Sequence, residues 1–379
     1  MPFVSERDHR LPKIIIGDMI KEALERKGVI SLGHGEPDFS MPEPLKQYAK
    51  HIAGKFNHYS QPGGRSELKK AISKKLNKDN SIFATPDEII VTAGSTEALL
   101  LGMTATLDIG DEIILPNPSF MVYEPMVDML GIKPVFTKLS KEKEFEIDPD
   151  DVEKRITKKT GAILINSPSN PTGNVLSKNT LEEIADICVE YNLFLLSDEA
   201  YEKIVYDKKH ISPASLNGMH EYVITFQSFS KSHAMCGHRV GYCVAPKSIS
   251  KIITETHMYS SICAPTFSQV LATKALSLSD AFANAMVREY RRRRNYIVKR
   301  LNNIGLDCVM PQGAFYAFAK IPSKDSYNFA RKMLEKANVI VIPGREFGKY
   351  GEGFIRLSYA SSMHNIGLAL DRIEKFLKK

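Results

Sequence analysis

The stretch AILINSPSNPTG, residues 162–173, runs from a continuous apolar segment into a turn with two prolines and a glycine. An unbroken apolar segment is typical of a strand buried on both faces, and these turn residues fix a rigid connection. An amphipathic segment over residues 178–190 follows, and FLLSDEAY, residues 194–201, repeats the apolar strand with a polar end. Strand, helix and strand in succession predict two parallel strands joined by a helix.

The same alternation extends outward in both directions from this unit. We expect seven strands, at residues Glu88–Thr92, Glu112–Leu115, Lys133–Phe136, Ala162–Asn166, Phe194–Ser197, Val223–Phe226 and Gly241–Val244. Helical patterns such as residues 95–107 lie between several of them. The pattern predicts an α/β fold with a mostly parallel, seven-stranded sheet covered by helices.

The pattern changes after Thr266. Residues 267–301 predict a long helix broken near residues 277–280. Strands at 314–319, 339–342 and 354–358, a helix at 326–337 and a last helix from Asn365 would then form a smaller α+β domain. We therefore expect a large domain over residues 41–275 and a small domain over 276–379, with the N-terminal segment 1–40 packing against the small domain.

Composition excludes several classes of protein. With 43% hydrophobic and 25% charged residues the chain is neither disordered nor fibrous, and its formal charge of +7 does not require nucleic acid. We interpret the basic run Arg291–Arg294 as a solvated helix face, with Tyr290 and Leu301 turned inward. No apolar run is long enough to span a membrane. Five scattered cysteines without metal-binding spacing indicate reduced thiols in the cytoplasm and no metal site.

Polar residues follow the predicted strands at the edge where open α/β sheets bind ligands. Ser95 and Thr96 open a helix, either as an anion site or as ordinary caps. Asn170 lies in the rigid turn and either meets a ligand or only forms the turn. Asp198 ends a buried strand, either as a helix cap or as the partner of a ligand cation.

Two cations complete this set. Lys231, in the sequence Ser228-Phe229-Ser230-Lys231, is either an amine nucleophile or a solvated charge. Arg356 lies inside an apolar strand and needs a carboxylate or phosphate partner, from the protein or from a ligand. An anion cradle, an amine, a carboxylate, an amide and an arginine together suit pyridoxal 5′-phosphate and an amino-acid substrate.

The sequence resembles the fold-type-I, class I aminotransferases that depend on pyridoxal phosphate, in the branch of archaeal and bacterial aspartate and aromatic aminotransferases. The resemblance runs nearly end to end. It rests on LGHGEPDF (32–39), HYSQPGG (58–64), VTAGSTEAL (91–99), NPTG (170–173), SDEAY (197–201), SFSK (228–231), HRVGY (238–242), GAFY (313–316) and IRLSYA (355–360).

The resemblance implies a role for each site residue. Lys231 would bind the cofactor aldehyde and move the substrate proton, Asp198 would keep the pyridine nitrogen protonated, and Tyr201 would tune the cofactor together with Asn170. Phe120 would stack on the ring. The phosphate ligands would be Ser95, Thr96, Ser228 and Arg239, with Tyr59 from the neighbouring subunit. The substrate carboxylate would be held by Arg356, with Gly35 and Asn170 lining the same pocket.

The implied reaction is ping-pong transfer of an amino group between an L-amino acid (aspartate, aromatic or broad) and a 2-oxo acid, with 2-oxoglutarate as the expected acceptor. The resemblance also implies a homodimer with shared active sites. Thr96 stands where some aspartate aminotransferases carry a lysine for the distal carboxylate. The alternative is a C–S β-lyase or an aminocyclopropane-carboxylate-synthase-like enzyme, since these share every cofactor contact. A regulator of this fold would carry a DNA-binding motif, and we expect none.

Overall fold

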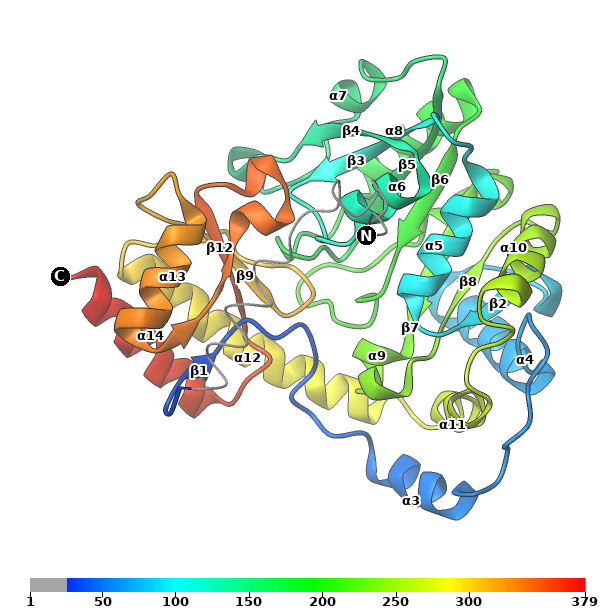
Figure 1. Ribbon diagram of the computed structural model, residues 1–379, viewed down its shortest axis with the longest axis horizontal. Helices are drawn as coiled ribbons and strands as arrows, with labels where there is room; N and C mark the ends of the chain where they lie inside the picture. Colours follow the sequence, from blue (N-terminus) through cyan, green and yellow to red (C-terminus); the bar gives the residue numbers. More distant parts are fainter. Residues whose placement is uncertain (1–25, 379) are drawn as a thin grey trace, which may run out of the picture.

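The computed structural model describes residues 26–378 of the chain. Its centre is a seven-stranded sheet with the order β2-β8-β7-β6-β5-β3-β4 (Figure 1). The strands are β2 (Ile89–Thr92), β3 (Glu112–Asn117), β4 (Lys133–Lys138), β5 (Thr160–Asn166), β6 (Phe194–Asp198), β7 (Val223–Ser228) and β8 (Gly241–Val244). Only β8 runs antiparallel to its neighbours, β2 and β7. The predicted α/β fold and mostly parallel sheet are confirmed.

Helices cover both faces of this sheet, and the alternation of side chains along each strand shows why. In β5, Ile163 and Ile165 join one apolar cluster with α8, whereas Ala162 and Leu164 join another with α5. The helices around the sheet are α3 (Glu43–Ile52), α4 (Ser66–Lys75), α5 (Ser95–Thr106), α6 (Tyr123–Leu130), α7 (Pro149–Glu153), α8 (Lys178–Tyr191), α9 (Phe229–Ser232), α10 (Lys247–Ser260) and α11 (Thr266–Leu276). Burial on both faces explains the continuous apolar strands.

The C-terminal part forms a separate layer beside the sheet (Figure 1). The predicted long helix is indeed interrupted, since α11 ends at Leu276 and the next helix begins at Ala281. The elements are α12 (Ala281–Asn303), β9 (Tyr316–Lys320), α13 (Ser326–Ala337), β10 (Val339–Ile340), β11 (Ile342–Pro343), β12 (Phe354–Ser358) and α14 (Met363–Leu377). Strand β1 (Ile30–Ser31) pairs in parallel with β10. The domain boundaries at residues 40 and 275 stay a prediction, and residues 1–25 lie outside the described part.

Two details differ from the sequence interpretation. The expected strand 339–342 is two strands, because β10 pairs with β1 whereas β11 pairs with β12, and the chain changes sheets at the buried Val341. The basic run is only half solvated. Arg293 is buried between Asp38 and Glu289, and Arg294 is buried against Asp207, because carboxylates from neighbouring segments neutralise both.

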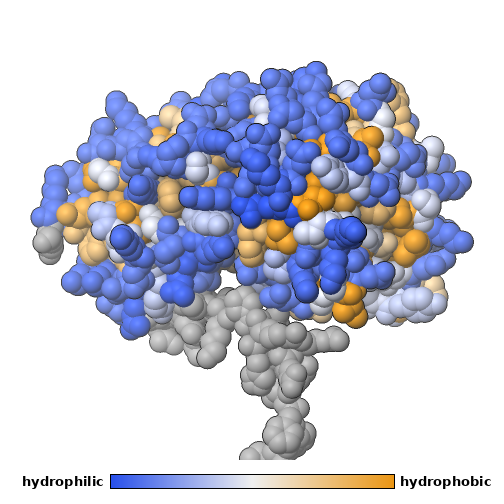
Figure 2. Space-filling view, turned by 90° about the horizontal axis from the view of Figure 1, so that it is seen from above, coloured by the Kyte–Doolittle hydropathy of each residue, from blue (hydrophilic) through white to orange (hydrophobic). Residues whose placement is uncertain are grey.

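The surface is mostly polar on the face shown in Figure 2, and the cysteines form no disulfides among the described residues. The face seen from above is mostly hydrophilic, with hydrophobic residues in separate patches (Figure 2). All five cysteines are free thiols, and burial raises the pKa of Cys188, Cys243 and Cys308 to about 12. Within residues 26–378, no helix combines the length and apolar character needed to cross a membrane.

Candidate active site

A cavity of about 290 Å³ opens at the carboxyl ends of β5, β6 and β7. It gathers residues from both parts of the fold. Eleven of the twelve predicted site residues line it: Gly35, Ser95, Thr96, Phe120, Asn170, Asp198, Tyr201, Ser228, Lys231, Arg239 and Arg356. Tyr59 does not. The topology therefore brings together residues that are up to 321 positions apart, from Gly35 to Arg356.

Lys231 lies on the short helix α9, directly after β7. Its Nζ donates to the carbonyl of Gly35 at 2.6 Å and lies 5.7 Å from the ring centroid of Tyr201. The amine is half-buried and points into the cavity rather than to bulk solvent. This placement fits an amine nucleophile and argues against the alternative of a solvated surface charge.

Asp198 is the last residue of β6 and is almost fully buried. The alternative of a helix cap is wrong, because a turn follows it. Its Oδ2 accepts from the hydroxyl of Tyr123 at 2.6 Å, and its Oδ1 accepts from the backbone of Ala200 at 3.1 Å. Burial raises the pKa of Asp198, while the Tyr123 hydroxyl, the Ala200 amide and the Lys231 charge oppose that rise. A buried carboxylate held in this way is prepared to pair with a ligand cation.

Replacing Tyr123 with phenylalanine tests the importance of that hydrogen bond. A hydrogen bond to a charged group contributes roughly 1.5–3 kcal/mol, so we expect kcat/KM to fall about tenfold or somewhat more. Because the lost donor favoured the ionised carboxylate, the pKa of Asp198 should rise, and activity should be lost at a higher pH on acidification. The measurement is the pH profile of kcat/KM.

A matched control is Tyr191→Phe, which removes a tyrosine–glutamate hydrogen bond of 3.0 Å on the surface of α8. This variant should keep the wild-type profile. An unchanged acid limb in Tyr123→Phe would show that the tyrosine does not act on Asp198.

Two buried tyrosines that line the cavity contact each other. The hydroxyl of Tyr201 lies 2.7 Å from that of Tyr316, in β9. Burial raises the pKa of Tyr201 well above its usual value, so the phenol keeps its proton and can donate a hydrogen bond. Asn170 is held close by, because its backbone N–H donates to Oδ1 of Asn166 at 2.8 Å.

Arg356, in the middle of β12, is 5% exposed and lines the same cavity. Its Nη1 donates to Oδ1 of Asn170 at 3.0 Å and its Nη2 to the carbonyl of Gly33 at 2.7 Å. Its guanidinium stacks 4.4 Å from the ring centroid of Tyr316. Burial lowers the pKa of Arg356, and its Nε has no hydrogen-bond partner in residues 26–378.

The expected alternative for Arg356, an internal salt bridge, is wrong for the part of the chain that the structure describes. No carboxylate in residues 26–378 lies within ion-pair distance of this guanidinium. Since a buried charge is costly without a partner, the arrangement fits an anionic ligand.

The N-terminus of α5 forms an anion cradle at the other end of the cavity. The helix begins after Gly94, whose φ of 89° is left-handed, and neither Ser95 nor Thr96 caps it. A Cβ at Gly94 would lie 2.5 Å from Nη2 of Arg239, so glycine lets the guanidinium approach the helix end. Among the described residues, Arg239 donates only to the backbone carbonyls of Ala93 and Cys236. Its charge and the free helix N–H groups suit a phosphate.

Tyr59 lies apart from the cavity, with 80% of its surface exposed. The loop that carries it is nevertheless anchored, because Thr266 Oγ1 donates to the carbonyl of His58 at 2.7 Å and lies 2.8 Å from Ser60 Oγ. The structure of one chain thus leaves the predicted reach of Tyr59 into a neighbouring subunit as a proposal.

Sequence reasoning missed several residues of this site. Tyr316 belongs to the motif GAFY and Tyr123 lies three residues after Phe120, but no local pattern assigns either tyrosine a partner. The cavity is further lined by Gly33, Leu99, Met121, Asn166, Ala200, Ser230 and Ile342. Their position depends on which strands are neighbours, which a single sequence does not state.

The donor set fits pyridoxal 5′-phosphate. The cradle at α5 suits its phosphate, Asp198 its ring nitrogen, Tyr201 its phenolic oxygen and Lys231 its aldehyde. Arg356, which has no carboxylate partner in the described part of the chain, then remains for a substrate carboxylate. Fold and site together define a pyridoxal-phosphate enzyme that acts on amino acids.

Comparison with known proteins narrows the class. The family described as "Aminotransferase class I and II" matches residues 27–373. An aromatic-amino-acid aminotransferase 2 of Thermococcus litoralis is 45% identical, over 93% of this chain and 92% of the relative. An aspartate aminotransferase of Pyrococcus abyssi is 46% identical over the same shares.

Solved structures agree. The aromatic aminotransferase from Pyrococcus horikoshii has a TM-score of 0.90 at 45% identity, covering 95% of this chain and 98% of that one. The aspartate aminotransferase from Thermus thermophilus with maleate has a TM-score of 0.94 at 36% identity, covering 99% and 100%. The chain belongs to the class I and II aminotransferases. It is a transaminase of the fold-type-I class, and its cofactor is pyridoxal phosphate.

Proposed function

We propose that this enzyme transfers the amino group of an L-amino acid to a 2-oxo acid by a ping-pong reaction, with 2-oxoglutarate as the acceptor. The observation that carries the proposal is the buried guanidinium of Arg356. It faces the same cavity as Lys231 and Asp198 and has no carboxylate partner within residues 26–378. Amino acids and 2-oxo acids share the carboxylate that it would bind.

The roles of the site residues follow from their chemistry. Bound pyridoxal phosphate supplies an aldehyde that condenses with amines and a ring that accepts the electron pair released at the substrate Cα. Asp198 holds the proton on the ring nitrogen, and Tyr123 orients that carboxylate. Lys231 Nζ takes the proton from Cα and delivers it again. Arg356 fixes the substrate carboxylate, so that Cα stays within reach of the amine.

The cavity lining bears on the amino donor, which we propose to be aspartate, an aromatic amino acid or both. Among the described residues, the cations that line the cavity are Lys231, Arg239 and Arg356, and each already has a proposed partner. A side-chain carboxylate would therefore need a cation from outside the described part or from a second subunit. The apolar lining by Leu99, Met121 and Ile342 supports an uncharged aromatic side chain.

We further propose a homodimer with shared active sites. Support comes from an exposed apolar patch near Tyr59, because Met258 and Tyr259 at the end of α10 are 51% and 84% exposed. His257, next to them, lies 2.8 Å by Nδ1 from the carbonyl of Pro62 in the loop of Tyr59. A cytoplasmic location is part of the same proposal, and the five free thiols support it.

A single-turnover experiment tests the proposed reaction. Holoenzyme mixed with tyrosine, phenylalanine or aspartate and no acceptor should release one equivalent of the matching 2-oxo acid per active site and then stop. Addition of 2-oxoglutarate should restart it and yield glutamate. Release of ammonia, pyruvate or a thiol without an acceptor would instead identify a lyase, and continuous 2-oxo acid release without an acceptor would contradict the ping-pong reaction.

A further inference from the structure

A buried polar network lies on the side of the strand ends that faces away from the active site. Three of its members are immediate chain neighbours of site residues. Glu199 follows Asp198, Glu202 follows Tyr201, and Gln227 precedes Ser228. Successive residues of a strand point to opposite sides. In β7, Ser228 therefore lines the active-site cavity, whereas Gln227 points toward α4. None of Glu199, Glu202 and Gln227 lines the active-site cavity.

Glu199 is fully buried and saturated with donors. Its Oε1 accepts from Ser197 Oγ at 3.0 Å, and its Oε2 accepts from Ser212 Oγ at 2.6 Å and from Gln227 Nε2 at 3.0 Å. His210 Nε2 also lies 3.0 Å from Oε2. Together with Glu202, these side chains place two carboxylates and an imidazole within 4.8 Å of one another.

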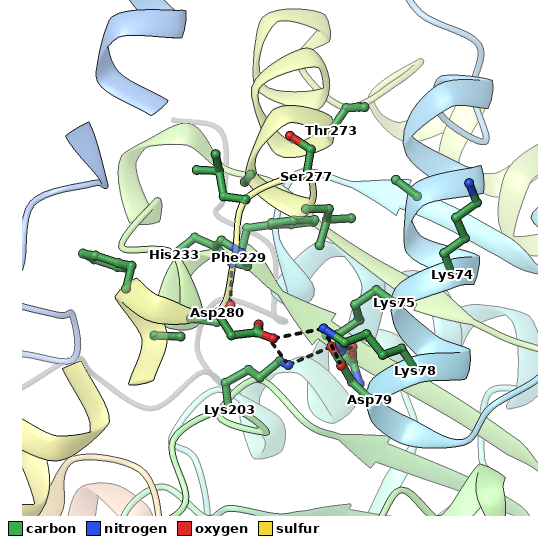
Figure 3. A pocket seen from close by; sticks show the side chains of 18 of the residues that line it. Lys74, Lys75, Lys78, Asp79, Lys203, Phe229, His233, Thr273, Ser277 and Asp280 are labelled. Carbon is green, nitrogen blue, oxygen red and sulfur yellow. Dashed lines mark hydrogen bonds and ion pairs between the residues drawn. The ribbon is translucent and has the colours of Figure 1, made fainter. Parts of the chain in front are cut away.

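Lys75, the last residue of α4, enters this network from outside the sheet (Figure 3). Its side chain is 10% exposed, and its Nζ donates to Gln227 Oε1 at 2.6 Å, to Asn80 Oδ1 at 2.8 Å and to Glu202 Oε1. An ammonium group has three protons, and all three are used. Lys75 therefore supplies a positive charge against the paired carboxylates of Glu199 and Glu202.

We propose that Lys75 is a positioning residue for the cofactor site. By holding Glu202 and Gln227 on the outer side of the strand ends, its ammonium group fixes the adjacent Tyr201 and Ser228 on the inner side. The proposal rests on the proposed function of those two residues as cofactor ligands. It concerns how firmly the site holds the cofactor rather than which substrate it takes.

Loss of the Lys75 charge should make cofactor binding depend on pH. Burial raises the pKa of Glu202, but the charge and the hydrogen bond of Lys75, together with the nearby His210 and a hydrogen bond from Asn80, bring that pKa below its ordinary value. Without Lys75 the carboxyl of Glu202 stays neutral at low pH. Above its raised pKa it becomes a buried, unpaired charge beside Glu199, which is costly. The network, and with it the site, should therefore loosen as the pH rises.

The other titratable groups around Lys75 are the same residues in the wild type and in the variants. They are Asp79 after α4, Lys203 beside Glu202, His210 beside Glu199, Tyr242 in β8, His233 after α9 and Asp280 before α12. Figure 3 shows Lys203, Asp79 and Asp280 as neighbouring ion pairs. Of these groups, His233 also responds to the Lys75 charge, which adds to burial in lowering its pKa. In Lys75→Met the pKa of His233 should rise, so its effect on binding would appear toward low pH, opposite to the effect of Glu202.

The test measures the dissociation constant of pyridoxal phosphate from holoenzyme by absorbance between pH 6 and 9. From pH 6 to pH 9, the dissociation constant of Lys75→Met should rise at least tenfold more than that of the wild type. The KM of the amino donor should change little. Lys75→Arg should follow the wild type. Lys74→Met is the matched control, because Lys74 is one residue away on α4, is exposed and has no ion pair in Figure 3.

The double variant Lys75→Met/Glu202→Gln separates charge from packing. It removes both charges and should restore the wild-type pH dependence of cofactor binding, even if Lys75→Met alone does not fold. The proposal would be overturned if both variants lost the same cofactor affinity at every pH. It would also be overturned if cofactor binding by Lys75→Met had the wild-type pH profile. Failure of the proposed function would show differently, as the absence of 2-oxo acid release from wild-type holoenzyme.

Discussion

Replacing Lys231 with alanine is expected to abolish transamination, with a loss on the order of 10⁴-fold in kcat. A positioned general base contributes roughly 10²–10⁴-fold, and here the same amine also holds the cofactor. Lys231 is the lysine that lines the described active-site cavity, so no other described lysine can replace it there. The expected spectrum lacks the absorbance of covalently held cofactor.

Intact mass after borohydride reduction gives a second readout. Wild-type protein should gain the mass of the reduced cofactor, whereas the Lys231→Ala protein should not. Lys332→Ala, which changes an exposed lysine of α13, is the control and should behave as wild type. Wild-type turnover in the Lys231 variant would refute the assignment of the catalytic amine.

Replacing Arg356 with lysine should raise the KM for both the amino acid and the 2-oxo acid by about a hundredfold. Losing one partner of a buried, hydrogen-bonded charge pair costs roughly 2–5 kcal/mol. A lysine also cannot reproduce the two parallel hydrogen bonds of a guanidinium to a carboxylate. Arg356 contacts Gly33 and Asn170, and of these only Asn170 is a predicted cofactor residue. Because Arg356 contacts none of the residues of the phosphate cradle, cofactor affinity should change far less.

The role of Arg356 is tested by comparing the loss of substrate affinity with the loss of cofactor affinity in the Arg356→Lys variant. Steady-state kinetics supply the two KM values, and an absorbance titration supplies the cofactor dissociation constant. The control is Arg331→Lys, at an exposed ion pair with Glu335 on α13. If cofactor and substrate were weakened equally, Arg356 would serve the structure of the whole cavity rather than the substrate carboxylate.

Much of the fold could be predicted because strands buried on both faces have a distinctive sequence. Each of the seven predicted strands overlaps a strand of the observed sheet. The candidate residues at strand ends could be predicted as neighbours, since the carboxyl ends of parallel strands share one edge. Their roles toward the cofactor came from resemblance and stay proposals, although eleven of them line a single cavity.

The partners of these residues could not be predicted. Tyr123 and Asp198 are 75 residues apart, and the hydroxyl contact depends on how α6 packs against the sheet. The choice between an internal and an external partner for Arg356 was open in the sequence. It was decided by the absence of a carboxylate near its guanidinium in the described part of the chain.

The amino-acid sequence by itself determined the alternation of strands and helices and the residue types at the strand ends, because hydrophobic periodicity and turn chemistry act over a few neighbouring residues. Only the tertiary structure decided which charges are neutralised. It paired Arg293 with Asp38 and Lys75 with Glu202, and it left Arg356 without a counter-ion among residues 26–378. The physical reason is that Coulomb interactions and desolvation depend on distance and burial in three dimensions, which separation along the chain does not specify.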